Sequence, residues 1–96
     1  IGYNGMPSGW DNVCEESGKS KPEVLHAEAN AITKVARSPE SCLDAEIFCT
    51  HMPCIECAKL IYQSGISKLY YKHNYEAAKG CGKTFLSECD IELEQV

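Results

Sequence analysis

The clearest hydrophobic pattern in the chain is a stripe at helical spacing over residues 26–36, formed by Ala27, Ala31, Ile32, Val35 and Ala36. An apolar stripe with this period predicts an amphipathic helix over roughly residues 26–37, beginning at or near His26. A second helix is expected over about residues 54–64, because Pro53 suits the first turn of a helix. Gly65 is well placed to end that helix as a C-terminal cap.

Two short apolar runs flank the second helix and are typical of strands. Residues 45–50 (AEIFCT) and 67–72 (SKLYYK) are rich in strand-forming side chains. A strand–helix–strand order with short connections predicts a βαβ unit with parallel strands. His73-Asn74-Tyr75 should then form a turn at the carboxyl end of the second strand, which is where ligands bind in open α/β sheets.

The two ends of the chain carry weaker patterns. Residues 1–3 are similar to the end of a strand, Asn4-Gly5 is a turn signal, and residues 10–22 are polar enough for a surface excursion. Residues 76–88 are expected to be helical in part, with an interruption at 80–82, and residues 91–94 alternate like a final short strand. Because the chain would otherwise begin inside an element, we expect an N-terminal segment to be missing.

Length and charge narrow the class of protein. The 96 residues predict one domain over 1–96 with a modest core. The net charge of -5 argues against a broad basic surface for nucleic acid. Neither a run of about 20 apolar residues nor a signal peptide is visible, so we expect no membrane partner.

Cysteine is unusually common, with seven residues in the chain. Two of them belong to the motif described next, and five remain: Cys14, Cys42, Cys49, Cys81 and Cys89. In a secreted protein these five would suggest disulfide bridges. Beside a metal motif they favour the reducing cytoplasm instead.

The candidate chemistry lies in two short stretches, His26-Ala27-Glu28 and Pro53-Cys54-Ile55-Glu56-Cys57. Together they offer three zinc ligands, His26, Cys54 and Cys57, and one carboxylate, Glu28. A catalytic zinc site keeps three protein ligands and leaves the fourth position for water, whereas a structural site fills it with a side chain. All four groups fall at predicted helix starts, where the dipole favours a carboxylate and lowers the pKa of a cysteine.

Each half of this pattern also has a plainer explanation. Cys54-x-x-Cys57 alone suits a redox pair or half of a structural zinc site, and His26 alone suits a helix cap. None of these explanations requires the glutamate two residues after the histidine or the proline before the first cysteine. H-x-E followed by P-C-x-x-C is a known signature of zinc-dependent nucleobase deaminases.

The chain resembles the deoxycytidylate (dCMP) deaminases, within the cytidine deaminase-like superfamily, and late-competence deaminases of bacteria look similar. The resemblance rests on GYNGMPSGWDNVCEE, HAEANAI and MPCIECAKLIYQSGI. HAE with PCxxC is shared by enzymes acting on cytosine, guanine or tRNA adenosine, and GYNGMPSG points to dCMP. The resemblance implies a three-layer α/β/α fold with a mixed sheet, whose N-terminal helix and first strand are missing here.

The implied activity is hydrolysis of dCMP to dUMP and ammonia. The family's motif implies that His26, Cys54 and Cys57 bind Zn2+ and that Glu28 moves the proton. It also implies that Asn4 hydrogen-bonds the deoxyribose and that Tyr75 lines the pocket. His51 and His73 flank that pocket without the neighbours of a metal ligand.

The family further implies a homo-oligomer, often a hexamer, controlled by dCTP and by dTTP with Mg2+. The region of Gly5 and Asn30 resembles its effector-binding part. Some phage members hold a second zinc through a cysteine in the position of Cys14, but its partner ligands are not evident in this sequence. Two alternatives to dCMP deamination stay open: deamination of another base, and a non-catalytic zinc-binding module.

Overall fold

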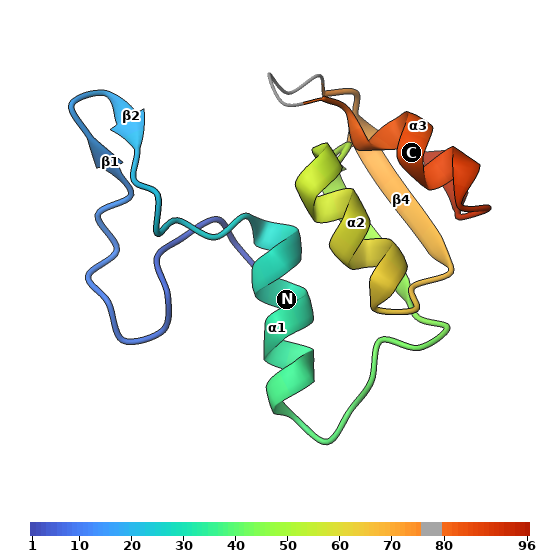
Figure 1. Cartoon of the computed structure of the whole chain (residues 1–96), viewed down its shortest axis with the longest axis horizontal. Helices are drawn as coiled ribbons and strands as arrows, with labels where there is room; N and C mark the ends of the chain where they lie inside the picture. The colour runs from blue at the N-terminus through green and yellow to red at the C-terminus, as the bar shows by residue number, and fades with distance from the viewer. Residues whose placement is uncertain (76–79) are drawn as a thin grey trace.

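The computed structural model describes residues 1–75 and 80–96 (Figure 1). Within them, helices and strands alternate along the chain in the order β1 (Glu15–Glu16), β2 (Lys19–Ser20), α1 (Ala27–Arg37), β3 (Glu46–His51), α2 (Ile55–Gln63), β4 (Lys68–His73), α3 (Gly82–Glu88) and β5 (Glu92–Gln95). No helix of the described residues has the length and apolarity that crossing a membrane requires.

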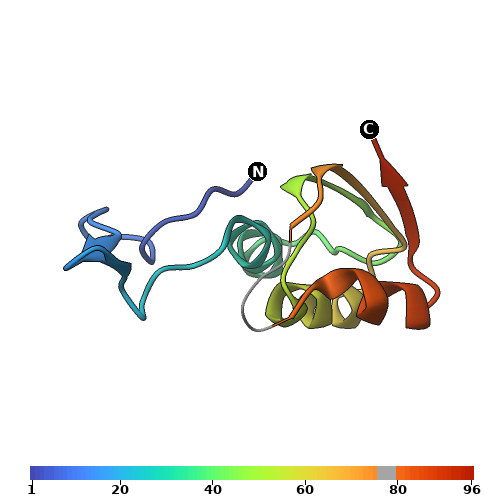
Figure 2. The ribbon, with the colours of Figure 1, turned by 90° about the horizontal axis from the view of Figure 1, so that it is seen from above.

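The body of the molecule is a parallel sheet with the strand order β3-β4-β5. Leu69 in the central strand pairs with Ile47 of β3 and with Leu93 of β5. Both connections between neighbouring strands run through a helix, and Figure 2 shows α2 and α3 on the same face of the sheet. The predicted βαβ unit is therefore confirmed, and α3 with β5 extends it by a second one.

The core fills the space between the sheet and these two helices. Strand β4 alternates, so that Leu69 and Tyr71 are buried against the helices. The helices contribute Ala58 and Ile61 from α2 and Leu86 from α3, none of them exposed. Helix α1 buries none of its residues and packs chiefly beside α2, which brings the two helix starts together.

The opposite face of the sheet carries exposed side chains. Phe48 is 72% exposed and stacks on Tyr70, with ring centroids 4.4 Å apart. The predicted α/β class is confirmed. The described strands of this sheet are all parallel, however, and their helices lie on one face, so a mixed sheet with helices on both faces is not what this part of the chain forms.

The starts of α2 and α3 are joined backbone to backbone. Cys54 and Cys81 form an antiparallel bridge, and the Gly82 N–H donates to the Pro53 carbonyl at 2.9 Å. A Cβ atom on Gly82 would lie 2.6 Å from that carbonyl oxygen and 2.7 Å from the Ala58 Cβ, closer than non-bonded atoms approach. Glycine is needed here because the two backbones touch.

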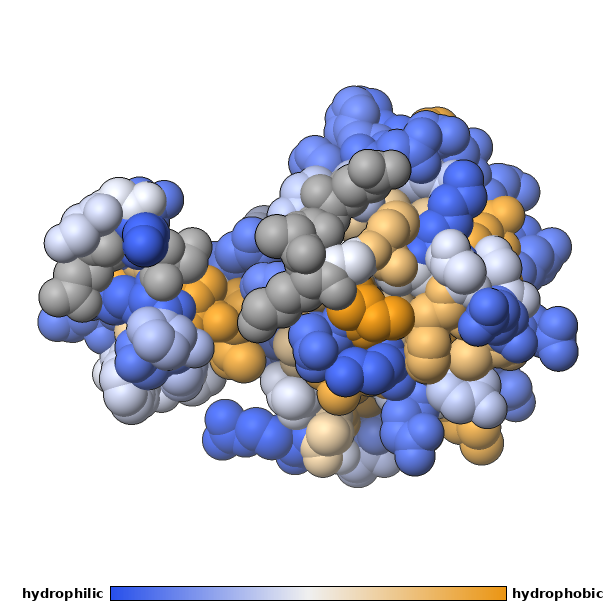
Figure 3. Space-filling view, turned by 45° about the horizontal axis from the view of Figure 1, so that its top comes forward, coloured by the Kyte–Doolittle hydropathy of each residue, from blue (hydrophilic) through white to orange (hydrophobic). Residues whose placement is uncertain are grey.

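One expectation for the N-terminal part is wrong, and one further element is present. Residues 1–3 form no strand, because their carbonyl groups bond to side chains of α1: Asn30 donates to Tyr3 O and Lys34 to Ile1 O. The polar excursion at 10–22 contains the antiparallel hairpin β1–β2, which projects from the body in Figure 3. Ser17 and Gly18 both have positive φ, the geometry of a type I′ hairpin turn.

The remaining boundaries agree with expectation within one or two residues. α2 ends at Gln63, and Gly65 follows with a φ of 90°, as a C-terminal cap requires. α3 begins at Gly82 with Cys81 as its N-cap, consistent with the interruption expected at 80–82. The helical expectation for residues 76–79 lies outside the described residues.

Replacing Leu69 by alanine should lower the free energy of unfolding by about 2–5 kcal/mol, because it opens a cavity under the central strand. Leu43→Ala is the matched control: Leu43 is 69% exposed, and its change should stay within about 0.5 kcal/mol. Urea denaturation of both variants measures the difference. Equal losses would contradict the assigned core.

Candidate metal centre and active site

The candidate metal centre lies where the starts of α1 and α2 meet. His26 is the N-cap of α1 and Cys54 the N-cap of α2, and Cys57 follows within the first turn of α2. Both N-caps have extended backbone and make no side-chain capping bond, so their side chains are free to turn toward each other. The His26 imidazole nitrogen and the two sulfur atoms lie within 4.8 Å of one another.

The spacing of these atoms fits a tetrahedral zinc ion. The His26 Nδ1 lies 3.5 Å from Cys54 Sγ and 3.4 Å from Cys57 Sγ. Zinc–sulfur and zinc–nitrogen bonds of about 2.3 and 2.0–2.1 Å at tetrahedral angles separate such donors by roughly 3.5 Å. One imidazole and two thiolates are also a donor set that zinc favours.

The cluster holds three ligands among the described residues, and a third cysteine nearby does not join it. Cys81 is the backbone neighbour of Cys54, yet its sulfur accepts from the Lys83 N–H at 3.4 Å. Three protein ligands with a free fourth position are characteristic of catalytic zinc.

Glu28 stands beside this cluster in the first turn of α1, half-buried. Its charge reaches two thiols. Burial first, and Glu28 second, raise the pKa of Cys57 to about 12, with Cys54 adding to the rise and a backbone hydrogen bond from Ala29 opposing it. The pKa of Cys49, on the neighbouring strand, is raised to about 12 by burial and then by Glu28.

The raised pKa of Cys57 bears on how the centre binds a metal ion. A buried thiol facing a carboxylate keeps its proton at neutral pH. A divalent cation reverses this balance, since it stabilises the thiolates and the carboxylate together. Zinc binding at neutral pH therefore has to release thiol protons.

The predicted site residues converge on one open cavity of about 280 Å³. It is lined by Asn4, His26, Glu28, His51, Met52, Cys54 and Tyr75. Cys57 is buried and reaches the cluster from outside this lining. Gly5 and Asn30, the residues expected near an effector, do not line it.

Asn4 also has a structural role, which the sequence pattern did not predict. Its Oδ1 accepts the Ala27 N–H at 2.7 Å, so it satisfies a free donor at the start of α1 that His26 leaves unpaired. With the oxygen engaged there, the amide NH2 is the end that can serve a ligand. Asn4 thus fixes the start of the helix that carries His26 and Glu28.

Gly5 and Asn30 hold the same segment in place. Gly5 and Leu25 exchange two backbone hydrogen bonds of 3.0 and 2.7 Å, and Asn30 bonds to Tyr3 O. Asn4 lies between these two attachments. Sequence reasoning could not find them, because each joins residues 20 or more positions apart.

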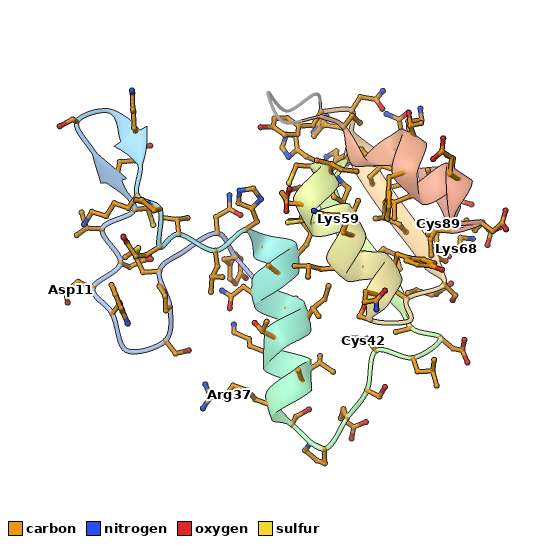
Figure 4. All side chains as sticks on the ribbon, in the orientation of Figure 1. Asp11, Arg37, Cys42, Lys59, Lys68 and Cys89 are labelled. Carbon is orange, nitrogen blue, oxygen red and sulfur yellow. The ribbon has the colours of Figure 1, made fainter. Side chains whose placement is uncertain are left out.

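The other cysteines lie outside the cluster. All seven are free thiols. Figure 4 labels Cys42 in the segment between α1 and β3, and Cys89 at the end of α3. Cys14 contacts Asn12 Oδ1 at 3.4 Å, and among the described residues it belongs to no cluster of three or more metal-binding side chains.

Comparison with known proteins places this geometry in a family. A family model described as the cytidine and deoxycytidylate deaminase zinc-binding region matches residues 1–73, which include His26, Glu28, Cys54 and Cys57. The chain belongs to this family. The resemblance to dCMP deaminases noted from the sequence is confirmed.

Individual members of the deaminase family are similar over nearly all of this chain. Deoxycytidylate deaminase of enterobacteria phage T4 is 43% identical over 137 aligned positions, covering 99% of this chain and 71% of the relative. ComE operon protein 2 of Bacillus subtilis is 34% identical over 99 positions, covering 99% and 52%. The chain spans about half the length of the first curated relatives it matches.

A solved structure is similar in fold as well as sequence. The dCMP deaminase from the cyanophage S-TIM5, crystallised in complex with dCMP and dUMP, superposes with a TM-score of 0.90 at 44% identity. The match covers 99% of this chain and 70% of that one. Identity at this level supports a similar site as well as a similar fold.

Replacing Cys57 by serine should abolish stoichiometric zinc binding, because it removes one of three ligands. Cys14→Ser is the control, and it should keep about one zinc ion per chain, as expected of a single three-ligand site. Metal analysis of both purified variants measures this. Full zinc in Cys57→Ser, or a halved content in Cys14→Ser, would contradict the assignment.

Replacing Asn4 by alanine should lower the free energy of unfolding by about 1 kcal/mol, the usual cost of losing a helix N-terminal cap. Asn4→Asp keeps an accepting oxygen and should cost much less. Chemical denaturation of the two variants provides the comparison. If both lose the same stability, the bond to Ala27 is not what anchors this segment.

Proposed function

We propose that this chain carries the active centre of a zinc-dependent dCMP deaminase, which converts dCMP and water to dUMP and ammonia. The observation that carries the proposal is the cluster of His26, Cys54 and Cys57 at the edge of one cavity, which is lined by His26, Cys54, Glu28, Asn4 and Tyr75. The dCMP and dUMP bound to the cyanophage relative support the choice of substrate.

In this proposal His26, Cys54 and Cys57 hold the zinc ion. When bound, zinc supplies an activated water, because it lowers the pKa of that water from 15.7 toward about 7. The three ligands come from the starts of two packed helices, so the position of the ion is fixed by the α1–α2 contact. His26 and Cys54 line the cavity, so a base that entered it would lie beside the metal ligands.

Glu28 moves the protons. Its carboxylate would take one proton from the attacking water and deliver it to N3 of the pyrimidine, and then carry the second proton, from the new C4 hydroxyl, to the departing amine. Water adds at C4, the C4–N bond breaks, and the oxygen stays on the base. The half-buried position of Glu28 beside the cluster supports this role.

Asn4 and Tyr75 would position the substrate. With its oxygen bound to Ala27, Asn4 offers its NH2 group to a sugar oxygen. Tyr75 follows β4, lines the same cavity, and offers a flat ring against which the base or sugar would pack. Both residues belong to the lining of the same cavity.

The proposal extends to regulation and assembly on the resemblance to the family. dCTP, and dTTP with Mg2+, would act as effectors near Gly5 and Asn30, in a cytoplasmic homo-oligomer such as a hexamer, with residues 1–96 forming one domain. The attachment of Gly5 to Leu25 and of Asn30 to Tyr3 supports a mechanical link between that region and the cavity. A ligand bound there would act on Asn4, which lies between the two.

Ammonia release from dCMP, dCTP, cytosine and guanine by zinc-loaded protein tests the substrate. We expect turnover with dCMP and much less with the free bases. Zinc-loaded protein that turns over another base and not dCMP would overturn the choice of substrate. Bound zinc with no turnover of any base would favour a non-catalytic zinc module.

Replacing Glu28 by glutamine should keep the zinc content and lower kcat on dCMP by about 10²–10⁴-fold, because proton transfer is lost while the cavity keeps its shape. Glu56→Gln is the matched control: Glu56 lies between the two cysteines but is exposed and pairs with Lys59 at 3.1 Å. Steady-state kinetics gives kcat for both variants, and metal analysis gives their zinc content. A near-normal rate in Glu28→Gln would remove Glu28 from the mechanism.

A further inference from the structure

One histidine in the cavity lining, His51, has a second histidine, His73, beside it, and neither belongs to the cluster of metal-binding side chains. His51 is the last residue of β3 and His73 the last of β4, and the parallel register makes them direct neighbours. Their ring centroids are 5.1 Å apart at an interplanar angle of 39°. The Met52 N–H donates to the His73 carbonyl at 2.8 Å, which ties the two strand ends together.

The alternation of the strands decides where these rings lie. Cys49 and Tyr71 point toward the helices from β3 and β4, and His51 and His73, two residues further along, lie on the same face. This row of side chains runs beside Glu28, whose charge reaches Cys49. It then leaves the core at the carboxyl edge of the sheet, where both histidines are exposed.

His51 is also part of the cavity lining, together with Tyr75. The Tyr75 ring meets the His51 ring edge-on, with centroids 6.3 Å apart. The His51 Nδ1 lies 3.2 Å from Thr50 Oγ1, which leaves Nε2 to face a ligand. The wall of the cavity thus passes from the cluster at His26 and Cys54 to an imidazole and a tyrosine at the opening.

The negative charge of the chain means that a phosphate group needs a local hydrogen-bond donor in order to bind at this cavity. At a net charge of -5, and with Glu28 in the cavity, the protein repels a phosphate group unless a local donor binds it. Imidazoles donate N–H bonds to phosphate oxygens, and more strongly when protonated. Among the described side chains that line the cavity, His51 is the group able to carry positive charge apart from the metal ligand His26.

We propose that His51 and His73 bind the 5′-phosphate of the nucleotide and so select a nucleoside monophosphate over the nucleoside. The inference rests on the proposed function for the position of the base. With the base at the zinc end and the sugar near Asn4, the phosphate points toward the opening. There two adjacent strands each present one imidazole.

Kinetics on two substrates tests the selection. In His51→Gln and His73→Gln, kcat/KM for dCMP should fall about tenfold or more through KM, as expected for the loss of a charge-assisted hydrogen bond. The value for deoxycytidine should not change. Lys72→Gln is the matched control, because Lys72 adjoins His73 on the opposite face of β4, and it should leave both substrates unaffected. An equal fall for both substrates would overturn the proposal.

A binding measurement separates this inference from the proposed function. In the zinc-loaded chain, dUMP and inorganic phosphate should shift the imidazole ¹⁵N resonances of His51 and His73, and deoxyuridine should not. Such shifts without dCMP turnover would leave the phosphate site standing and reject the dCMP reaction. Turnover of dCMP with unshifted resonances would keep the reaction and overturn the role of the two histidines.

Discussion

The contact between the starts of α1 and α2 is the constraint on which the rest of the structure depends. It brings two thiols within 3.5 Å of one imidazole nitrogen, beside a carboxylate. Without a cation this arrangement holds buried thiols against negative charge, which is why the pKa of Cys57 rises to about 12. The same packing becomes favourable once a divalent ion enters, so the centre is built for metal and not for burial alone.

The parallel sheet supplies the second half of the site. Strands β3 and β4 end at the same edge, and their last residues continue the inward-facing rows that form the core. Helix α2 begins just past that edge, after Pro53 and its N-cap Cys54. One cavity therefore collects His51 from the end of β3, Cys54 from the start of α2 and Tyr75 from the segment after β4. Ligand sites of other open α/β sheets lie at the same edge.

Local patterns in the sequence accounted for the parts of the fold that local physics determines. The helical stripe at 26–36, the proline and glycine at the ends of α2 and the two strand-like runs each predicted an element that the structure contains. The hairpin at residues 15–20 was missed, although Ser17-Gly18 is suited to its turn. The strand expected at residues 1–3 was wrong, because side chains of α1 compete for its carbonyl groups. The zinc ligands and Glu28 could be named from their motif, whereas the Asn4–Ala27 bond and the pairing of His51 with His73 depend on contacts distant in sequence.

The close approach at Gly82 has a consequence for the C-terminal third of the molecule. Because α3 begins in backbone contact with Pro53 and Cys54, any force that immobilises Cys54 also restrains α3, and through it β5. Metal occupancy and local opening of the last two elements are therefore thermodynamically linked, although neither element contributes a ligand. The free energy of metal binding would be spread over a region of the chain that the ion never touches.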